Sequence, residues 1–357
     1  MIEAASKPLT IQLSTWSCES TEEIKHAILN NGNITVELTN IGCAITALHV
    51  PDRNGILANI VAGFNDLQQY KENPDYFGCV VGRFTNRITN GQFQLNGTQY
   101  QLTVNNGNNH LHGGWVGFNK KCWQVQELIE TENECGIVFA TSSAHEEEGY
   151  PGNLSITVTY LLGRDNRMRI VYKAETDKST PVSLTNHSYF NLTGFANPVV
   201  YDHVLSVAAW EYTAKSDNNT ATGEILPVAG TPLDFRLPKR IGNDIHELTI
   251  DNGYDHNFIL KRTNSRDILN AAIVSEPTSG RMITVYTDKP AMQLYTGNFW
   301  NGAVTGPQHI PYEKHGGVAL ETQAFPDSPN HPHFPAAILH PGEMYMSTTI
   351  YEFGVLS

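Results

Sequence analysis

Residues 93–104, FQLNGTQYQLTV, carry the clearest fold signal in this chain. Phe93 and Leu95 alternate with polar residues, Asn96-Gly97 follows, and the alternation resumes at Tyr100. Asn-Gly between two alternating runs is the strongest short-range hairpin signature, because both residues tolerate the positive φ angles of a tight turn. The stretch therefore predicts two antiparallel strands joined by a two-residue turn.

The same alternation recurs elsewhere. Apolar residues occupy every second position of 34–38, 154–160, 168–172 and 283–285, and the residues between them are polar except Val171. This period is typical of half-buried antiparallel strands. No long stripe of period 3.6 interrupts it, and only 66–72 and 243–248 are expected to form short helical turns. The pattern predicts an all-β protein with a few short helices.

Length and charge limit the organisation and the partners. The chain has 357 residues and 40% hydrophobic content, without a Pro- or Ser-rich linker, a low-complexity tract or a fixed-period repeat, which favours one domain over 1–357. Its formal charge of -13 disfavours nucleic acid and anionic membranes as partners. No apolar run is long enough for a membrane span, and no apolar signal core lies near the start, so we expect a cytoplasmic location.

The cysteines indicate a reducing environment. They are odd in number, widely spaced and without a CxxC pair, which favours free thiols over a disulfide framework or a zinc knuckle. We expect buried apolar roles for Cys18, Cys43, Cys79, Cys122 and Cys135.

The run SLTNHSYFNLTG at 183–194 raises a different question. If it is extended, Leu184, Phe190 and Leu192 face one side, whereas the polar side chains face the other. That polar face comprises Thr185, His187, Tyr189 and Asn191. It could be a solvated surface, a satisfied buried network or the wall of a pocket, and periodicity does not choose among these.

Several familiar chemistries have no signature here. GxGxxG after a strand, GxxxxGK[ST] and GxSxG are all absent from the sequence, which disfavours nucleotide cofactors and serine hydrolysis. His110 and His112 could present two imidazoles on one strand face, but no Glu or third His follows at close range. We therefore expect neither a metal nor a cofactor.

Short polar islands are more informative. They are GRFTNRI (82–88), NHLHGG (109–114), EEEGYPG (146–152), NHSYFNL (186–192), YDHNF (254–258), QLYTGNF (293–299) and ALETQAFPD (319–327). They supply donors and acceptors suited to a neutral polyol, namely Asn86, Arg87, Asp255 and Gln293. They also supply groups that can exchange protons near neutral pH, namely His112, His187 and Glu321. Taken singly, each is more often a surface ion pair, a turn residue or a satisfied core group.

In this order, the islands NRI, LHGG, TNHSYFNL, DHNF, QLYTGNF and LETQ resemble the aldose 1-epimerase (galactose mutarotase) family, from about residue 32 to residue 353. The resemblance implies a large antiparallel β-sandwich. It also implies interconversion of the α and β anomers of free galactose, and of glucose, without metal or nucleotide. Residues 1–31 match the family poorly and are expected to be an extension or an edge segment.

The resemblance also implies roles for individual residues. Glu321 corresponds to the family's general base and His187 to its general acid, while His112 is expected beside the ring oxygen. Substrate-binding positions fall on Asn86, Arg87, Asp255 and Gln293, with Tyr189 as a further pocket residue. Proton exchange between an ionised Glu and a protonated His would need polar neighbours that support Glu321 and an anion near His187, for which Asp255 is a candidate.

Other functions stay open at this stage. A glycoside hydrolase could use Asp255 and Glu321 as paired carboxylates. A sugar-binding or regulatory module could keep the fold without catalysis. A hexose-phosphate epimerase would need positive charge at the pocket, for which Arg87 and Arg83 are the candidates. The sequence is compatible with a monomer or a homodimer whose only further partner is a small sugar.

Overall fold

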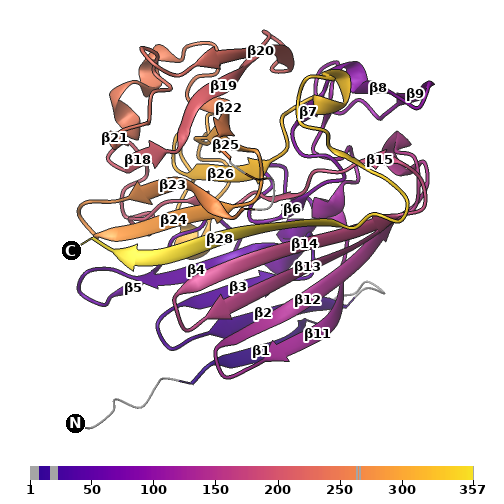
Figure 1. Ribbon diagram of the computed structural model, residues 1–357. Helices are drawn as coiled ribbons and strands as arrows, with labels where there is room; N and C mark the ends of the chain where they lie inside the picture. Colours follow the sequence, from indigo (N-terminus) through magenta and orange to yellow (C-terminus); the bar gives the residue numbers. More distant parts are fainter. Residues whose placement is uncertain (1–7, 17–22, 263, 265–266, 357) are drawn as a thin grey trace.

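The structure is a computed structural model, and it describes residues 8–16, 23–262, 264 and 267–356. Three antiparallel sheets dominate it, with five, nine and six strands (Figure 1). The five-stranded sheet runs in sequence order through β1 (Thr10–Trp16), β2 (Ile24–Asn30), β3 (Thr35–Thr39), β4 (Ile45–Pro51) and β5 (Leu57–Asn59).

The two larger sheets are built from strands that are distant in sequence. The nine-stranded sheet has the order β11 (Gln124–Glu130), β12 (Glu134–Ser143), β13 (Leu154–Gly163), β14 (Arg167–Thr176), β28 (Tyr345–Val355), β24 (Arg281–Thr287), β23 (Leu269–Ser275), β18 (Val204–Val207) and β21 (Lys239–Arg240). The six-stranded sheet has the order β17 (Tyr189–Phe190), β26 (Val318–Gln323), β25 (Ala291–Tyr295), β22 (Asp255–Leu260), β19 (Ala209–Lys215) and β20 (Ala221–Pro227).

Short paired segments complete the architecture. They are β10 (His110–Leu111) with β7 (Arg87–Ile88), β15 (Thr180–Pro181) with β27 (Ile338–Leu339), β16 (Thr185–Asn186) with β6 (Val80–Val81), and β8 (Gln92–Leu95) with β9 (Thr98–Gln101). All the helices in the described part are short 3₁₀ turns: η1 (Leu67–Lys71), η2 (Thr89–Gly91), η3 (Phe118–Lys120), η4 (Glu147–Gly149), η5 (Ile241–Asn243), η6 (Ile245–Glu247), η7 (Pro307–His309) and η8 (Ser328–Asn330). Within the described ranges, none of these helices is long and apolar enough to cross a membrane.

One apolar core joins the three sheets. Val36 of β3, Ile156 of β13 and Leu294 of β25 belong to the same buried cluster, so the long sheet covers both of the others. Figure 1 shows β2–β4 behind β12–β14, and the six-stranded sheet beyond the β24 side. In β13 and β14 the alternation places apolar residues inward and polar residues toward solvent, as the sequence predicts, whereas β26 is buried along its whole length. The predicted β-sandwich is confirmed.

The predicted hairpin is also present. Leu95 pairs with Thr98, and the turn residues Asn96 and Gly97 have φ angles of 52° and 78°. The second strand ends at Gln101, so its expected continuation through Val104 is wrong. The two predicted helical turns appear as η1, which Asp66 caps, and as η5 with η6.

The run 183–194 is not one strand. It forms β16 and β17, which are separated at His187-Ser188, and every residue of 183–192 is buried. The side chain of Asn186 accepts hydrogen bonds from the backbone N–H and the hydroxyl of Ser188, and this local turn competes with a continuous ladder. Leu184, Phe190 and Leu192 all join the main core. A solvated polar face is therefore excluded for this run.

The remaining sequence expectations divide between described and undescribed residues. Cys43, Cys79 and Cys135 are buried free thiols and Cys122 is half-buried, whereas Cys18 lies outside the described residues. Within the segment 1–31, residues 1–7 and 17–22 also lie outside them, and the described parts form β1 at a sheet edge and β2 beside it.

Candidate active site

A cavity of about 220 Å³ brings the predicted site residues together. All eight line its wall: Asn86, Arg87, His112, His187, Tyr189, Asp255, Gln293 and Glu321. Pockets for drug-sized ligands usually measure roughly 300–1,000 Å³, so this volume suits a smaller molecule.

Strand register in the six-stranded sheet positions half of these side chains. Residues that pair across neighbouring strands share a face, as do residues i and i+2 of one strand. The relevant cross-strand pairs are Gln293 with Glu321, Tyr189 with Ala319, Tyr295 with Ala319, and Asp255 with Tyr295. Tyr189, Asp255, Gln293 and Glu321 therefore project from the same face and form one wall of the cavity.

The short β7–β10 pair supplies a second group of cavity residues. Leu111 pairs with Arg87, and the backbone N–H of His112 donates to the carbonyl of Asn86 at 3.1 Å. Asn86 and His112 both have positive φ angles, of 65° and 55°. Gly113 follows at φ 92°, where a Cβ would lie 1.7 Å from the carbonyl oxygen of Gly82. Only glycine fits there, which explains the Gly after His112 in the LHGG motif.

His187 and Glu321 form the centre of the cavity. His187 Nε2 lies 3.5 Å from Glu321 Oε1, and both side chains are almost completely buried. His187 Nδ1 and Glu321 Oε2 have no hydrogen-bond partner among the described residues. The ring of Tyr76 stacks on that of His187, with centroids 5.7 Å apart. Two proton-exchanging groups thus meet in a water-poor site with unused capacity for a ligand.

Burial shifts the pKa values of Glu321 and His187 in opposite directions. It raises the pKa of Glu321 to about 8, with a further increase from the charge of Asp255. It lowers the pKa of His187 to about 4, although Asp255 opposes this change. The expected anionic influence of Asp255 on His187 is therefore present. The hydrogen bonds that were expected to keep Glu321 ionised are absent from the described structure, where Glu321 Oε2 is buried without a partner.

Groups for hydroxyl recognition surround this pair. Arg87 Nε donates to Asn106 Oδ1 at 3.0 Å, and Arg87 makes no ion pair with any described residue. Gln293 Nε2 donates to Asp255 Oδ1 at 2.6 Å. Burial opposes ionisation of Asp255, but the charges of Lys215 and Arg87 and the Gln293 hydrogen bond outweigh it and lower its pKa. The cavity thus offers a fixed acceptor and several donors to a polar ligand.

The geometry also brings together three groups that could ligate a metal. Donor atoms of His112, His187 and Glu321 lie within 4.8 Å of one another. However, His112 Nδ1 accepts the backbone N–H of Asn86 at 3.2 Å, so the neutral ring carries its proton on Nε2. Neither nitrogen of His112 then offers a lone pair to a metal ion. The trio fits a hydrogen-bonding role better than a ligand set.

The structure excludes two alternatives that the sequence left open. His110 does not share a site with His112, because its ring nitrogens contact the carbonyl of Thr103 and the hydroxyl of Tyr150. Arg83 supplies no charge to the cavity, since its buried guanidinium donates to the carbonyls of Pro151 and Gly152 and to other backbone groups.

The cavity contains further residues that the motifs did not identify. They are Pro74, Asp75, Tyr76, Asn106, Leu111, Tyr295 and Phe299. Tyr295 and Phe299 belong to the QLYTGNF island, so a polar island could have suggested them. Asp75 and Tyr76 follow Pro74 in a turn, and nothing in the local pattern indicates that this turn faces the site.

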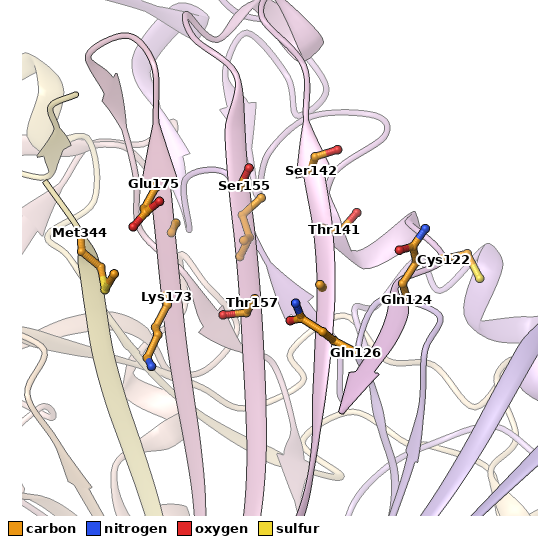
Figure 2. Close-up of a pocket in the computed structure, with 13 residues that line it drawn as sticks. Cys122, Gln124, Gln126, Thr141, Ser142, Ser155, Thr157, Lys173, Glu175 and Met344 are labelled. Carbon is orange, nitrogen blue, oxygen red and sulfur yellow. The ribbon is translucent and has the colours of Figure 1, made fainter. Parts of the chain in front are cut away.

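A larger groove lies elsewhere and contains different chemistry. It measures about 530 Å³ and crosses the solvent-facing side of β11–β14 (Figure 2). Gln126, Thr141, Thr157 and Lys173 project from successive strands in this view, together with Glu175. No histidine lines it, and the polar side chains Gln126, Thr157 and Lys173 lie on the outer face of their strands. The 220 Å³ cavity is therefore the candidate active site.

Fold and site together define a β-sandwich with a buried acid/base pair in a polar cavity. The family model described as aldose 1-epimerase matches residues 25–352. The chain is 44% identical to a galactose mutarotase of Sus scrofa, over 92% of this chain and 93% of that protein. It is 37% identical to an aldose 1-epimerase of Escherichia coli, over 91% and 93% of the two chains.

Solved structures agree with this match. A galactose 1-epimerase from Lactobacillus acidophilus superposes with a TM-score of 0.86 at 25% identity, covering 98% of this chain and 100% of the other. A GalM/aldose epimerase homologue from C. elegans gives 0.83 at 29% identity, covering 91% and 97%. This chain belongs to the aldose 1-epimerase family.

Proposed function

We propose that this protein is an aldose 1-epimerase that interconverts the α and β anomers of free galactose and of glucose. The observation that carries the proposal is the contact between His187 and Glu321 inside a small cavity lined with hydroxyl-binding groups. Ring opening requires one proton to leave the anomeric hydroxyl and another to reach the ring oxygen. Two adjacent acid/base groups are the minimum machinery for this exchange.

In the proposed reaction, the carboxylate of Glu321 takes the proton of the anomeric hydroxyl while protonated His187 gives a proton to the ring oxygen. The C1–O5 bond breaks and an open-chain aldehyde forms. Rotation about C1–C2 presents the other carbonyl face. The protonated Glu321 and neutral His187 then reverse both transfers and close the ring to the opposite anomer.

The pKa shifts determine where the proton lies before the sugar binds. With the pKa of Glu321 near 8 and that of His187 near 4, the free pair holds its single proton on Glu321. This neutral pair and the ionised pair differ only in which partner carries the proton. Transfer across the 3.5 Å contact converts one into the other, so the cavity needs no proton from solvent to begin. His112, with its proton on Nε2, is placed to donate a hydrogen bond to the sugar.

The test is polarimetry on freshly dissolved α-galactose with the parental chain, Glu321→Gln and His187→Asn. We expect each variant to lose at least about 100-fold in rate, since a positioned acid or base contributes roughly 10²–10⁴-fold. Circular dichroism should show that both variants are folded. A near-parental rate in either variant would contradict the assignment of Glu321 and His187 as the acid/base pair. An inactive parental chain would favour a sugar-binding module instead.

Hydrolysis of galactosides is the second candidate. Glu321 has a raised pKa and Asp255 a lowered one, and glycosidases separate their two carboxylates in this way. Release of nitrophenol from nitrophenyl galactosides distinguishes the two activities. The proposed epimerase releases none, because it acts on the free anomeric hydroxyl.

A further inference from the structure

Asp75 is a cavity residue without an assigned role. Its half-buried side chain lines the cavity together with His187 and Glu321. Among the described residues, Asp75 has no hydrogen-bond or ion-pair partner, whereas Asp255 is held by Gln293 and by Lys215. Burial raises the pKa of Asp75 above its ordinary value, as expected for a carboxyl that no donor stabilises.

The turn that carries Asp75 is rigid. Asn73 is buried and its side chain closes the turn, because its Oδ1 accepts the N–H of Phe77 at 2.7 Å and its Nδ2 donates to the carbonyl of Phe77 at 3.0 Å. The N–H of Tyr76 donates to the carbonyl of Asn73 at 3.1 Å. The ring of Tyr76 packs against both His112 and His187. Asp75 is thus held at a fixed position beside the proton-transfer pair.

The electrostatic influence of Asp75 falls on the aromatic side of the cavity. After burial, its charge is among the causes that raise the pKa of Tyr189 and that of Tyr295. Asp255 raises the pKa of His187 and that of Glu321, and it also raises that of Tyr295. Both aspartates thus act on Tyr295, whereas only Asp255 is among the causes of the shifts at His187 and Glu321.

We propose that Asp75 is a further substrate-binding residue whose carboxylate accepts hydrogen bonds from sugar hydroxyls and disfavours anionic sugars. This inference rests on the proposed function. A preorganised carboxylate with two free oxygens suits neighbouring hydroxyls of a neutral sugar, and such charge-assisted bonds are stronger than neutral ones. Together with the carboxylate of Asp255, which lines the same cavity, it adds to the negative charge that a hexuronate or a hexose phosphate would meet. The cavity selects neutral aldoses by this charge as well as by shape.

The experiment compares the parental chain with Asp75→Asn and Asp75→Ala, using Glu72→Gln as the matched control. Glu72 is an exposed carboxylate three residues away that does not line the cavity. Anomerisation of galactose and of galacturonate is followed by polarimetry at pH 7. We expect Asp75→Ala to raise KM for galactose about tenfold while kcat stays within about twofold.

We also expect the ratio of kcat/KM for galacturonate to kcat/KM for galactose to be about fivefold higher in both Asp75 variants than in the parental chain. Asp75→Asn keeps the size and a hydrogen-bonding oxygen, so it should relieve the charge effect with a smaller rise in galactose KM. Parental KM values in Asp75→Ala, unchanged discrimination in both variants, or equal changes in Glu72→Gln would each overturn the proposal.

Failure of the proposed function gives a different result. If the parental chain does not anomerise galactose, the role of Asp75 is decided by calorimetric titration of galactose into the same proteins. Weaker galactose binding by Asp75→Ala than by Glu72→Gln would then support the role of Asp75 in substrate binding, and equal binding would overturn it.

Discussion

At the scale of single residues, the pair His187 and Glu321 shows how burial sets chemistry. Both groups sit where water cannot solvate their charged forms, so each is driven toward its neutral form. The result is a pair that shares one proton over a broad pH range. The charge of Asp255 acts on both members and opposes the loss of a proton from either.

The pH dependence of activity follows from these shifts. Below a pKa of about 4 the pair takes up a second proton, and above a pKa of about 8 it loses its only one. We expect kcat/KM for galactose to be flat between these limits and to fall on both sides, with the two limits belonging to the pair as a unit. A profile that falls between pH 6 and 7 would contradict the shared-proton scheme.

Stability should respond to pH through the same glutamate. The pKa of Glu321 rises from its ordinary value of 4.5 to about 8 on folding, so the folded chain binds more protons in this window. The contribution of Glu321 to stability is therefore lost as pH rises from 4.5 to 8. Because glutamine does not titrate, Glu321→Gln should be more stable than the parent at pH 8, by up to about 1.4 kcal/mol per pH unit of the window, and equal near pH 4.5.

Thermal melting at pH 5 and pH 8 measures this difference, with Glu72→Gln as the exposed control. A Glu321→Gln variant that is less stable than the parent at pH 8 would show that the charged carboxylate is stabilised in the folded chain.

At the scale of elements, the short β7–β10 pair places three site residues although it has only two residues in each strand. Arg87 and Asn86 come from one segment and His112 from the other, and the two segments are fixed by their register. The positive φ angles at the two chain reversals turn the side chains of Asn86 and His112 into the cavity. Both reversals depend on local backbone freedom.

Two glycine substitutions distinguish a loss of His112 positioning from the backbone strain that any alanine causes at a positive φ angle. A Cβ at Gly113 would collide with the carbonyl oxygen of Gly82, whereas one at Gly97 meets nothing within 4 Å, and both residues have positive φ. We expect Gly113→Ala to displace His112 and to lower kcat/KM about 100-fold. Gly97→Ala should cost about 1 kcal/mol of stability and leave kcat/KM unchanged.

Steady-state rates and thermal melting of the two variants provide the comparison. Equal rates in both would mean that the LHGG glycine does not position the site.

At the scale of the whole molecule, buried arginines connect sheets that the strand ladders leave separate. Arg281 in β24 donates to the carbonyls of Val50, Ile56 and Leu192. These bonds link the nine-stranded sheet to the five-stranded sheet and to the segment after β17. The sandwich thus depends on buried side-chain hydrogen bonds as well as on its apolar core.

Removing Arg281 should destabilise the molecule without changing the chemistry. Arg281→Met removes three hydrogen bonds from a charged donor, each worth roughly 1.5–3 kcal/mol, so we expect a loss of about 3 kcal/mol or more, although Asp52 and Ser279 still donate to the carbonyls of Ile56 and Leu192. Arg53→Met is the control, since Arg53 is exposed and its side chain donates to one carbonyl among the described residues, that of Pro277. Urea unfolding measures the difference, and equal midpoints for the two variants would contradict it.

The sequence by itself determined the fold class and most of the candidate site. Alternation of apolar residues, as at 154–160, depends only on the two-residue period of a strand, and the Asn96-Gly97 turn depends only on local φ preferences. The ordered polar islands identified eight residues, and all eight line one cavity. Motif residues can be found in this way because each is tied to a characteristic neighbourhood in the chain.

Only the tertiary structure decided what those residues experience. The break in the run at His187-Ser188, the removal of Arg83 and His110 from the site, and the inclusion of Asp75 all depend on contacts between segments distant in sequence. The pKa shifts of Glu321 and His187 come from burial by several strands at once. Solvent exclusion is a property of packing in three dimensions, which a one-dimensional pattern does not contain.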